Sequence, residues 1–310
     1  MKKISIVVPC YNEEACIETF YYYATNFLNS ISYDYEIIFV NDGSVDLTAE
    51  LGQKLATVNN KVKLINLSKN FGQESAILAG LEHAKGDCAV VMDCDLQDPV
   101  ELIAEMLAKW EKGYKIVHTK RSQQKGVSWF KKITSKLYSF IFNLLSETKT
   151  KLIEGDFKLY DRQVLDEILK LPEKQKFFRG LTGFVGFKQT CVSFNRPKRK
   201  AGKTKYNLSK MINLGVDGVV SNSNKPLMLP FYFGSVLSAI AGIVFTVFTT
   251  LLMFKIYLPL TAWLFPTIIM LFSFVFIFMG IHNFYLGKIY NQTKNRPDYI
   301  IESKINFDND

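Results

Sequence analysis

Short apolar runs rich in β-branched residues alternate with longer amphipathic stretches between Ile4 and about Lys120. Five such runs read "ISIVV", "YEIIFV", "VKLINL", "CAVVM" and "YKIVH". The stretches between them have the apolar spacing of helices, roughly Glu13–Leu28, Asp46–Thr57, Gln73–Ala84 and Pro99–Trp110, the last with proline at a helix start. This alternation predicts an α/β fold with a mostly parallel sheet that is covered on both faces.

Polar clusters directly follow three of the predicted strands. They read "PCYNEE" after the first strand, "NDGS" after the second and "DCDLQDP" after the fourth. Ligands of parallel sheets bind beyond the carboxyl ends of the strands. Because these ends share one edge of the sheet, the three clusters predict one binding site.

The third cluster contains three carboxylates within six residues: Asp93, Asp95 and Asp98. On an extended chain, side chains two residues apart point to the same side, so Asp93 and Asp95 should face together while Cys94 faces away. The two carboxylates repel each other unless a positive charge lies between them. Asp98 precedes Pro99, and we expect it to cap the following helix. A solvated strand end is the alternative interpretation of the pair.

Two long segments nearer the C-terminus contain no Lys, Arg, Asp or Glu. Leu227–Phe254 has about 28 residues, roughly 42 Å as a helix, and Leu258–Tyr285 is about as long. Both predict membrane-spanning helices, and buried helices of a large soluble core are the alternative. Basic residues crowd outside the pair, whereas the connecting turn holds only Lys255. The positive-inside rule therefore predicts that both chain termini are cytoplasmic.

These segments predict a multi-pass protein of the cell membrane with a cytoplasmic domain over 1–225, two transmembrane helices over 226–290 and a cytoplasmic tail over 291–310. Within the domain, residues 127–146 fit either an amphipathic helix on the membrane surface or a core-facing helix. The polybasic stretch "RPKRKAGKTKY", Arg196–Tyr206, fits a phosphate clamp, a lipid-headgroup anchor or a solvated loop.

Composition adds few constraints. The 38 Lys and Arg residues outnumber 29 Asp and Glu, and a net charge of +9 suits nucleic acid, an anionic membrane surface or a phosphorylated substrate. The five cysteines form no CxxC pair and the three histidines lack metal-ligand spacing. Reduced core thiols in a cytosolic domain are therefore expected, with neither a disulfide framework nor a zinc site.

Eight motifs occur in one order along the chain: "VVPCYNEE", "VNDGS", "NFGQESAILAGL", "MDCDLQDP", "EGDFKLYDR", "RGLTGFVGF", "AGKTKY" and "YLGKIYNQTKNRP". In this order they resemble family 2 glycosyltransferases of the polyprenyl-phosphate type, the bactoprenol glucosyltransferases and dolichyl-phosphate mannose synthases. The resemblance covers nearly the whole chain. It implies a GT-A fold, a nucleotide diphosphate sugar as donor, a divalent cation (Mg²⁺ or Mn²⁺), a lipid phosphate as acceptor and a homo-oligomer, a tetramer in relatives.

The resemblance also implies roles for residues that match the family motifs. For the donor side these are Pro9, Tyr11, Asn12 and Glu13 around the nucleotide, Asp42 on the base, Asp93 on the ribose or the metal, and Asp95 with Gln97 on the metal. A hard cation takes one or two carboxylates and fills its other positions with phosphate oxygens and water. The Asp93 and Asp95 pair would then be neutralised only when donor and metal arrive.

On the acceptor side, Asp156 in "EGDFKL" matches the family's proposed catalytic aspartate. Arg121, Lys158, Arg199 and Lys205 match or neighbour basic positions expected to face diphosphate or lipid phosphate. Lys158 stands where relatives usually carry arginine, which replaces a bidentate fork with a point charge. Gln124 stands where a second arginine often follows Arg121. A phosphate acceptor is already largely ionised at neutral pH, so we expect Asp156 to orient groups instead of removing a proton.

We therefore expect inverting transfer of one sugar, with a UDP-sugar as the expected donor, to undecaprenyl phosphate at the cytoplasmic membrane face. A processive polysaccharide synthase is the closest alternative, but such enzymes usually carry a "QxxRW" motif, and none of the three tryptophans lies in one. A non-catalytic, membrane-anchored nucleotide-sugar binding protein is an alternative from another class. Nucleic-acid binding is not expected, because the basic residues flank the predicted membrane spans and do not interleave with exposed aromatic residues.

Overall fold

The structure is a computed structural model that describes residues 1–121, 154–174, 176, 178–194 and 260–307, with isolated positions between 232 and 253. The chain forms two compact units, which we describe separately. The first comprises Met1–Ser139, Thr148–Ile212 and Pro297–Asp310, and the second Phe140–Glu147 and Asn213–Arg296. The C-terminal tail therefore belongs to the same unit as the N-terminal domain.

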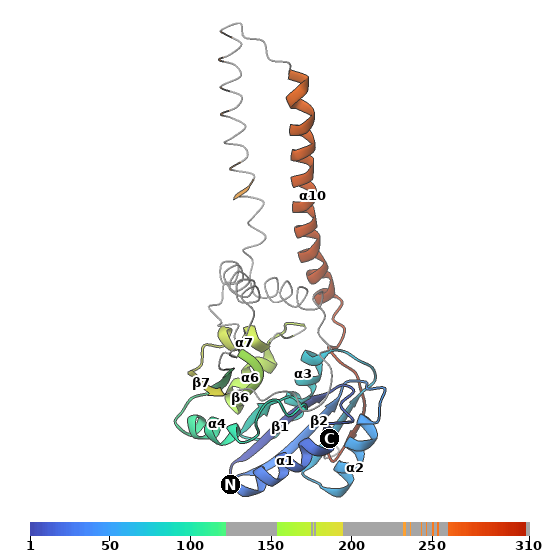
Figure 1. Ribbon diagram of the computed structural model, residues 1–310, viewed down its shortest axis with the longest axis vertical. Coiled ribbons are helices and arrows are strands. Elements are labelled where there is room, and N and C mark those ends of the chain that lie inside the picture. The colour runs from blue at the N-terminus through green and yellow to red at the C-terminus, as the bar shows by residue number, and fades with distance from the viewer. Residues whose placement is uncertain are drawn as a thin grey trace, which may run out of the picture. The chain divides into compact units, whose positions relative to one another are not determined.

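The described part of the first unit contains one mixed sheet of eight strands (Figure 1). The strands are β1 (Lys3–Cys10), β2 (Asp34–Asn41), β3 (Val62–Leu67), β4 (Cys88–Val91), β5 (Ile116–Arg121), β6 (Glu154–Asp161), β7 (Gln189–Phe194) and β8 (Ile301–Ile305). Their order across the sheet is β7-β5-β6-β4-β1-β2-β3-β8. β4, β1, β2 and β3 are parallel neighbours, and β5 is parallel to β7.

β6 and β8 run antiparallel to their neighbours, which makes the sheet mixed. The apolar runs of the sequence predict β1 to β5 and their parallel core, and the structure confirms both. They do not predict β6, because "EGDFKLYD" places charged residues in a strand that lies between β4 and β5. They do not predict β8 either, because that strand is short and mostly exposed.

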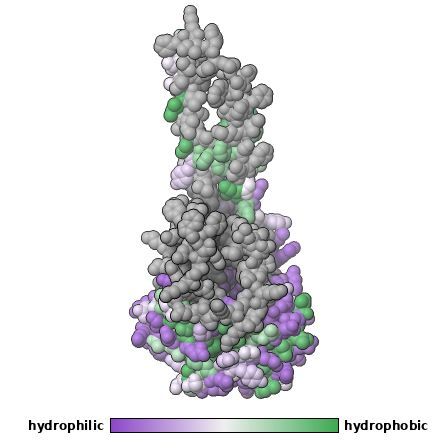
Figure 2. Space-filling view, viewed as in Figure 1, coloured by the Kyte–Doolittle hydropathy of each residue, from purple (hydrophilic) through white to green (hydrophobic). Residues whose placement is uncertain are grey.

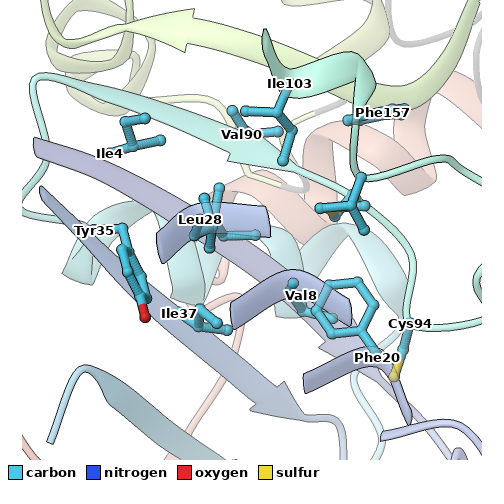
Figure 3. Close-up of a cluster of buried hydrophobic side chains, with 14 of the residues drawn as sticks. Ile4, Val8, Phe20, Leu28, Tyr35, Ile37, Val90, Cys94, Ile103 and Phe157 are labelled. Carbon is cyan, nitrogen blue, oxygen red and sulfur yellow. The ribbon is translucent and has the colours of Figure 1, made fainter. Parts of the chain in front are cut away.

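Helices cover both faces of the sheet. The helices of the first unit are α1 (Ile17–Ser30), α2 (Thr48–Val58), α3 (Gln73–His83), α4 (Leu102–Glu111), α6 (Arg162–Lys170) and α7 (Phe178–Phe184). Side chains alternate along each strand, so Val8, Val90 and Phe157 pack on the face covered by α1, α2 and α4 (Figure 3). Val91 and Tyr160 pack on the opposite face, beneath α3, α6 and α7.

The prediction that Asp98 caps the fourth helix is wrong. α4 begins at Leu102, and its cap residue Glu101 makes no side-chain cap bond. The carbonyl of Pro99 accepts a hydrogen bond from the Leu102 amide at 3.2 Å, so a tight turn separates the proline from the helix. Asp98 is buried before this turn.

The described residues of the second unit include one long helix, α10 (Leu260–Thr293), which has 34 residues and overlaps the second charge-free segment. Several of its side chains, and nearly all of residues 227–254, lie outside the described residues. Counting only the positions that the structure describes, no helix combines the length and the apolar character needed to cross a membrane. The visible coloured face of the first unit is mostly hydrophilic, with apolar residues scattered over it (Figure 2).

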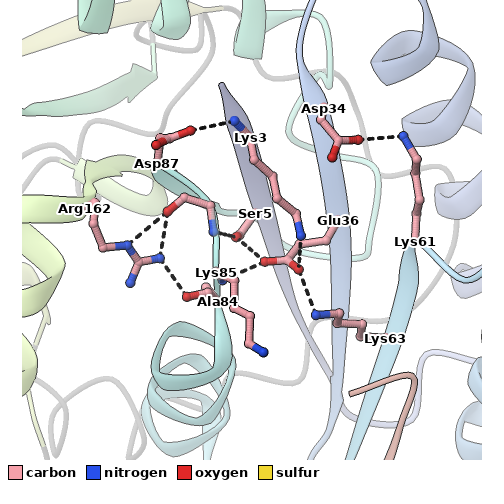
Figure 4. Close-up of polar contacts among 11 residues, drawn as sticks. Lys3, Ser5, Asp34, Glu36, Lys61, Lys63, Ala84, Lys85, Asp87 and Arg162 are labelled. Atoms are coloured by element: carbon pink, nitrogen blue, oxygen red, sulfur yellow. Dashed lines mark hydrogen bonds and ion pairs between the residues drawn. The ribbon is translucent and has the colours of Figure 1, made fainter. Parts of the chain in front are cut away.

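A buried carboxylate joins three parallel strands near their amino ends. The Glu36 Oε1 atom accepts hydrogen bonds from the Ser5 hydroxyl at 2.6 Å and from the Lys85 backbone amide at 2.7 Å (Figure 4). Its Oε2 atom lies 2.9 Å from the Nζ atoms of both Lys3 and Lys63. Glu36 therefore links β1, β2 and β3 to the turn after α3.

The same turn is held from its other side by Arg162. The Arg162 guanidinium donates to the carbonyl oxygens of Ala84 at 2.7 Å and Gly86 at 2.8 Å (Figure 4). The Gly86 amide donates to the Ser5 hydroxyl at 2.8 Å. These bonds fix the C-terminal end of α3 against the sheet.

We expect Glu36→Gln to destabilise the protein by about 3 kcal/mol, because it removes the charge that pairs with two lysines in a buried position. Burial alone would raise the pKa of Glu36, but the hydrogen bonds from Ser5, Lys63, the Lys85 amide and Lys3 outweigh it and lower the pKa to about 2. The folded-state pKa lies below the ordinary value of 4.5. The stabilisation is therefore present above pH 4.5 and is lost as the pH falls towards 2.

Urea unfolding of the full chain in detergent at several pH values would measure this effect. The matched control is Asp34→Asn, because the Asp34 pair with Lys61 is exposed and should contribute less than about 1 kcal/mol. Equal unfolding midpoints for the two variants at neutral pH would contradict the assignment.

Candidate active site

The loops after β1, β2, β3 and β4 meet at the carboxyl edge of the parallel strands. β6 is antiparallel to β4, and its register pairs Lys158 with Val91, the last residue of β4. The start of β6, with Asp156, therefore lies at the same edge as Asp93. The structure confirms that the three polar clusters share one edge, and it adds β6 as a fourth contributor.

In the acidic loop after β4, burial alternates along the chain. Asp93 and Asp95 are half-buried, whereas Cys94 is buried in the core (Figure 3). A hydrogen bond with Cys10 and burial raise the pKa of the Cys94 thiol well above its ordinary value, so this thiol stays neutral. Cys94 thus packs as an apolar residue that turns the two carboxylates outward.

The backbone is strained directly after this pair. Leu96 has φ of 56°, in the left-handed region that leucine rarely adopts. The Asp95 Oδ1 atom accepts a hydrogen bond from the Gln97 amide at 3.1 Å, which closes a tight turn around Leu96. Such strain is typical of functional loops, where a fixed backbone geometry is needed.

Gln73, the first residue of α3, lies between two carboxylates of this edge. Its Nε2 atom is 3.1 Å from the Asp93 Oδ1 atom and 3.5 Å from the Asp156 Oδ2 atom. Asp93 from the loop after β4 and Asp156 from β6, which are far apart in sequence, thus both lie beside the amide group of Gln73. No local pattern in the sequence predicts this role of Gln73, because "NFGQ" stands out only as part of a family motif.

Asp42 has a structural role in addition to the base contact expected from the family. Its two carboxylate oxygens accept hydrogen bonds from the backbone amides of Phe71 at 2.7 Å and Gly72 at 3.0 Å. Burial raises the pKa of Asp42, and these two bonds oppose that shift. A Cβ atom on Gly43, where φ is 62°, would lie 2.3 Å from the Lys69 carbonyl carbon, so only glycine fits here. The loops after β2 and β3 are therefore locked together.

The loop after β1 is fastened to the loop after β2. The Asn12 amide donates to the Ser44 hydroxyl at 3.0 Å, and the Asn12 Oδ1 atom accepts from the Val45 amide at 2.9 Å. The Glu13 amide donates to the Thr48 hydroxyl at 2.8 Å. Asn12 has φ of 54°, which asparagine tolerates better than most residues. Tyr11, which directly precedes Asn12, is partly exposed and accessible to a ligand.

A ladder of polar side chains connects this loop to the C-terminal strand. The Asn66 Nδ2 atom donates to the Ser303 hydroxyl at 2.9 Å, and the Asn41 Nδ2 atom donates to the Asn66 Oδ1 atom at 3.0 Å. The Asn41 Oδ1 atom accepts from the Ser44 amide at 3.0 Å. Ser44 in turn holds Asn12. The tail strand is thus part of the hydrogen-bonded framework of the loop of residues 11–14.

The basic residues expected around phosphate are only partly described. Lys158 is 1% exposed in the middle of β6, between β4 and β5. Arg121 ends β5, and nothing is described of its side chain. Gln124, Arg199 and Lys205, the stretch 127–146 and the polybasic stretch 196–206 lie outside the described residues. Contact of the four basic residues with phosphate therefore stays a prediction.

The carboxylates fit a metal that is completed by its substrate. In the portion of the chain that the structure describes, no three His, Cys, Asp or Glu side chains are placed to hold a metal ion. Mg²⁺ bound through one or two carboxylates needs no such cage, because phosphate oxygens and water fill its other positions. Asp93 and Asp95, both half-buried in the same loop, match this pattern.

A mixed sheet of this order with an acidic loop at its carboxyl edge defines a glycosyltransferase of the GT-A type, with a Rossmann-like α/β domain. The sequence profile of glycosyl transferase family 2 matches residues 5–169. The chain belongs to glycosyl transferase family 2, and it is an enzyme of that class.

Relatives cover nearly the whole chain. The "uncharacterized glycosyltransferase YkcC" of Bacillus subtilis is 40% identical over 309 residues, 98% of this chain and 95% of the relative. The prophage bactoprenol glucosyl transferase homolog of Escherichia coli K12 is 36% identical and covers 97% of this chain and 98% of its own length. The bactoprenol glucosyl transferase of Shigella phage SfII is also 36% identical, with 97% of each chain covered.

Solved structures confirm the fold. Glucosyl-3-phosphoglycerate synthase from Mycobacterium tuberculosis, in complex with Mn²⁺, UDP and phosphoglyceric acid, has a TM-score of 0.51 at 17% identity, covering 71% of this chain and 76% of that chain. The same enzyme with Mn²⁺, UDP and glucosyl-3-phosphoglycerate has a TM-score of 0.50 at 18% identity. At this identity the likeness concerns the fold alone.

We expect Ser303→Ala to raise the KM for the glycosyl donor by about two- to fivefold, because one hydrogen bond worth roughly 1 kcal/mol is lost from the ladder. Asn66→Ala removes two bonds of the ladder and should raise this KM further, while kcat stays close to that of the wild type. Steady-state kinetics on the full chain would measure both constants. Glu302→Ala, an exposed position on the same strand, is the control. Donor KM values that do not differ among the three variants would refute a link between tail and loop.

Proposed function

We propose that the enzyme transfers one sugar, with inversion, from a nucleotide diphosphate sugar to a polyprenyl phosphate at the cytoplasmic face of a membrane. Relatives named bactoprenol glucosyl transferase, similar over almost their full length, support a polyprenyl acceptor. The observation that carries the proposal is the meeting of Asp93 from the β4 loop and Asp156 from β6 at one amide. In this proposal, a donor-side carboxylate and an acceptor-side carboxylate would face one reaction centre.

On the donor side, the loop residues Pro9, Tyr11, Asn12 and Glu13 would line the nucleotide, with Asp42 beside the base. Asp95 and Gln97, with Asp93 on the metal or the ribose, would hold Mg²⁺ or Mn²⁺ on the diphosphate. A bound divalent cation would stabilise the leaving diphosphate as the glycosidic bond breaks. The strained turn at Leu96 fixes where these ligands point.

On the acceptor side, the phosphate oxygen attacks the anomeric carbon directly. Most of a phosphate monoester is a dianion at neutral pH, so no general base is needed. Asp156 would orient Lys158 or the acceptor phosphate, and Arg121, Arg199 and Lys205 would hold that phosphate for in-line attack. Lys158 is buried, and its ammonium would therefore act at short range in a poorly solvated position.

A membrane location suits a lipid acceptor. The two charge-free segments of the sequence would supply a hairpin over 226–290, with both chain ends cytoplasmic. Apolar side chains of α10 are exposed, among them Leu271, Phe272, Val275 and Met279, and soluble proteins rarely expose such a row. A homo-oligomer would place several such anchors in one bilayer.

One prediction from the proposed function concerns sugar transfer and its dependence on a metal. Membranes that contain the enzyme should move label from a UDP- or GDP-sugar to undecaprenyl phosphate, and chelation should abolish this transfer. Asp95→Asn should lower the rate by at least about 10³-fold, because it removes a charged metal ligand beside the leaving group. Asp166→Asn, the same substitution on the exposed face of α6, should leave the rate unchanged. Full transfer in excess EDTA would exclude the metal-dependent mechanism.

Another prediction from the proposed function concerns membrane topology, which cysteine labelling in intact cells would measure. Lys255→Cys should react with an impermeant maleimide from outside, whereas Lys294→Cys should react only after permeabilisation. Cys191 is exposed and should first be replaced by serine, so that it does not contribute signal. Reversed labelling would place the enzyme on the wrong side of the membrane for cytosolic nucleotide sugars.

A further inference from the structure

Gln73 occupies a position that is fixed from several directions. The loop before it is held by Asp42, whose carboxylate binds the amides of Phe71 and Gly72. The helix that it begins packs closely on β1, where a Cβ atom at Gly80 would lie 2.3 Å from a Val7 methyl carbon. The backbone of Gln73 is therefore anchored at the loop and along the helix. Its amide group is held where the structure shows it, between the two carboxylates.

We propose that Gln73 is a positioning residue that couples the donor side of the site to Asp156. This inference rests on the proposed function. One side-chain NH₂ group carries two hydrogens, which suffices for one bond to Asp93 and one to Asp156. The two distances are unequal: the amide nitrogen is 3.1 Å from the Asp93 carboxylate and 3.5 Å from the Asp156 carboxylate. The longer bond is at the limit of a hydrogen bond and can shorten.

The difference between these two distances indicates that the coupling runs from Asp93 on the donor side to Asp156 on the acceptor side. Without donor, the amide lies closer to Asp93 than to Asp156. When the donor ribose or the cation binds Asp93, the hydrogen bond between Asp93 and the Gln73 amide becomes weaker. Gln73 can then move closer to Asp156. Donor binding would thus fix the acceptor-side carboxylate before the lipid phosphate attacks.

The amide also reduces repulsion between the two carboxylates. Partial positive charge on the NH₂ hydrogens lies between them, and the N-terminus of α3 adds the positive end of a helix dipole. A neutral hydrogen-bond donor such as glutamine suits this position better than lysine, whose ammonium group would compete with the metal for Asp93. Glutamine is also long enough to reach both carboxylates from the first turn of a helix.

The test compares Gln73→Ala and Gln73→Met with the wild type. We expect Gln73→Ala to lower kcat by about 10- to 100-fold, the size of effect that a misplaced reacting group produces, with donor KM changed less than threefold. Gln53→Ala, the same substitution on the exposed face of α2, should change neither constant. Thermal melting would confirm that the variants are folded.

Gln73→Met supplies a readout that a defect in helix folding would not give. Methionine is unbranched, close to glutamine in length and a good helix former, so this variant should fold. It lacks both N–H donors and cannot bond Asp93 or Asp156. Its kcat should therefore fall as far as that of Gln73→Ala, with donor KM changed less than threefold.

The outcomes separate the inference from the proposed function. A wild-type enzyme that transfers sugar to undecaprenyl phosphate, together with a kcat loss in both Gln73→Met and Gln73→Ala at nearly unchanged donor KM, supports the inference. Wild-type transfer with an unchanged kcat in Gln73→Met, or with an unchanged kcat in Gln73→Ala, overturns the inference and leaves the proposed function intact. Absence of wild-type transfer with every labelled donor overturns both.

Discussion

The common direction of β4, β1, β2 and β3 is the constraint on which the site depends. Parallel strands cannot be joined by tight hairpins, so each strand is followed by a loop and a helix that returns to the other edge. Every such loop therefore emerges at the carboxyl edge, and polar residues far apart in sequence meet there. β6 reaches the same edge from the opposite direction, so its first residues, with Asp156, face the loop that carries Asp93. A fully parallel strand at this place would put Asp156 at the wrong edge.

Charge is distributed unequally between the two ends of these strands. At the amino ends, Glu36 pairs with two lysines and accepts hydrogen bonds from a hydroxyl and an amide, and its charge stabilises the fold. At the carboxyl edge, Asp93 and Asp95 are half-buried beside a strained turn, and in the proposed function a ligand would complete their neutralisation. The paired end would then support an acidic end whose charges serve binding, as expected where a site must be preorganised.

The tail strand has two structural functions. β8 pairs with β3 and so covers an edge that would otherwise expose unpaired backbone groups. Its Ser303 also completes the ladder through Asn66 and Asn41 to the loop of residues 11–14. The tail is therefore not a passive extension of the chain. In the proposed enzyme, the chain would leave the catalytic unit, enter the membrane and return to support this loop.

The sequence by itself determined the class of the fold, the first five strands and the edge at which the polar clusters meet. These follow from the spacing of apolar residues and the alternation of strands with helices, which are local properties of the chain. Alternation at Asp93, Cys94 and Asp95 could be predicted for the same reason. Only the tertiary structure decided that β6 is antiparallel, that α4 begins beyond Asp98 and that Gln73 lies between two carboxylates. These features arise from contacts between residues distant in sequence. No local pattern encodes such contacts, because they form only when the sheet has assembled.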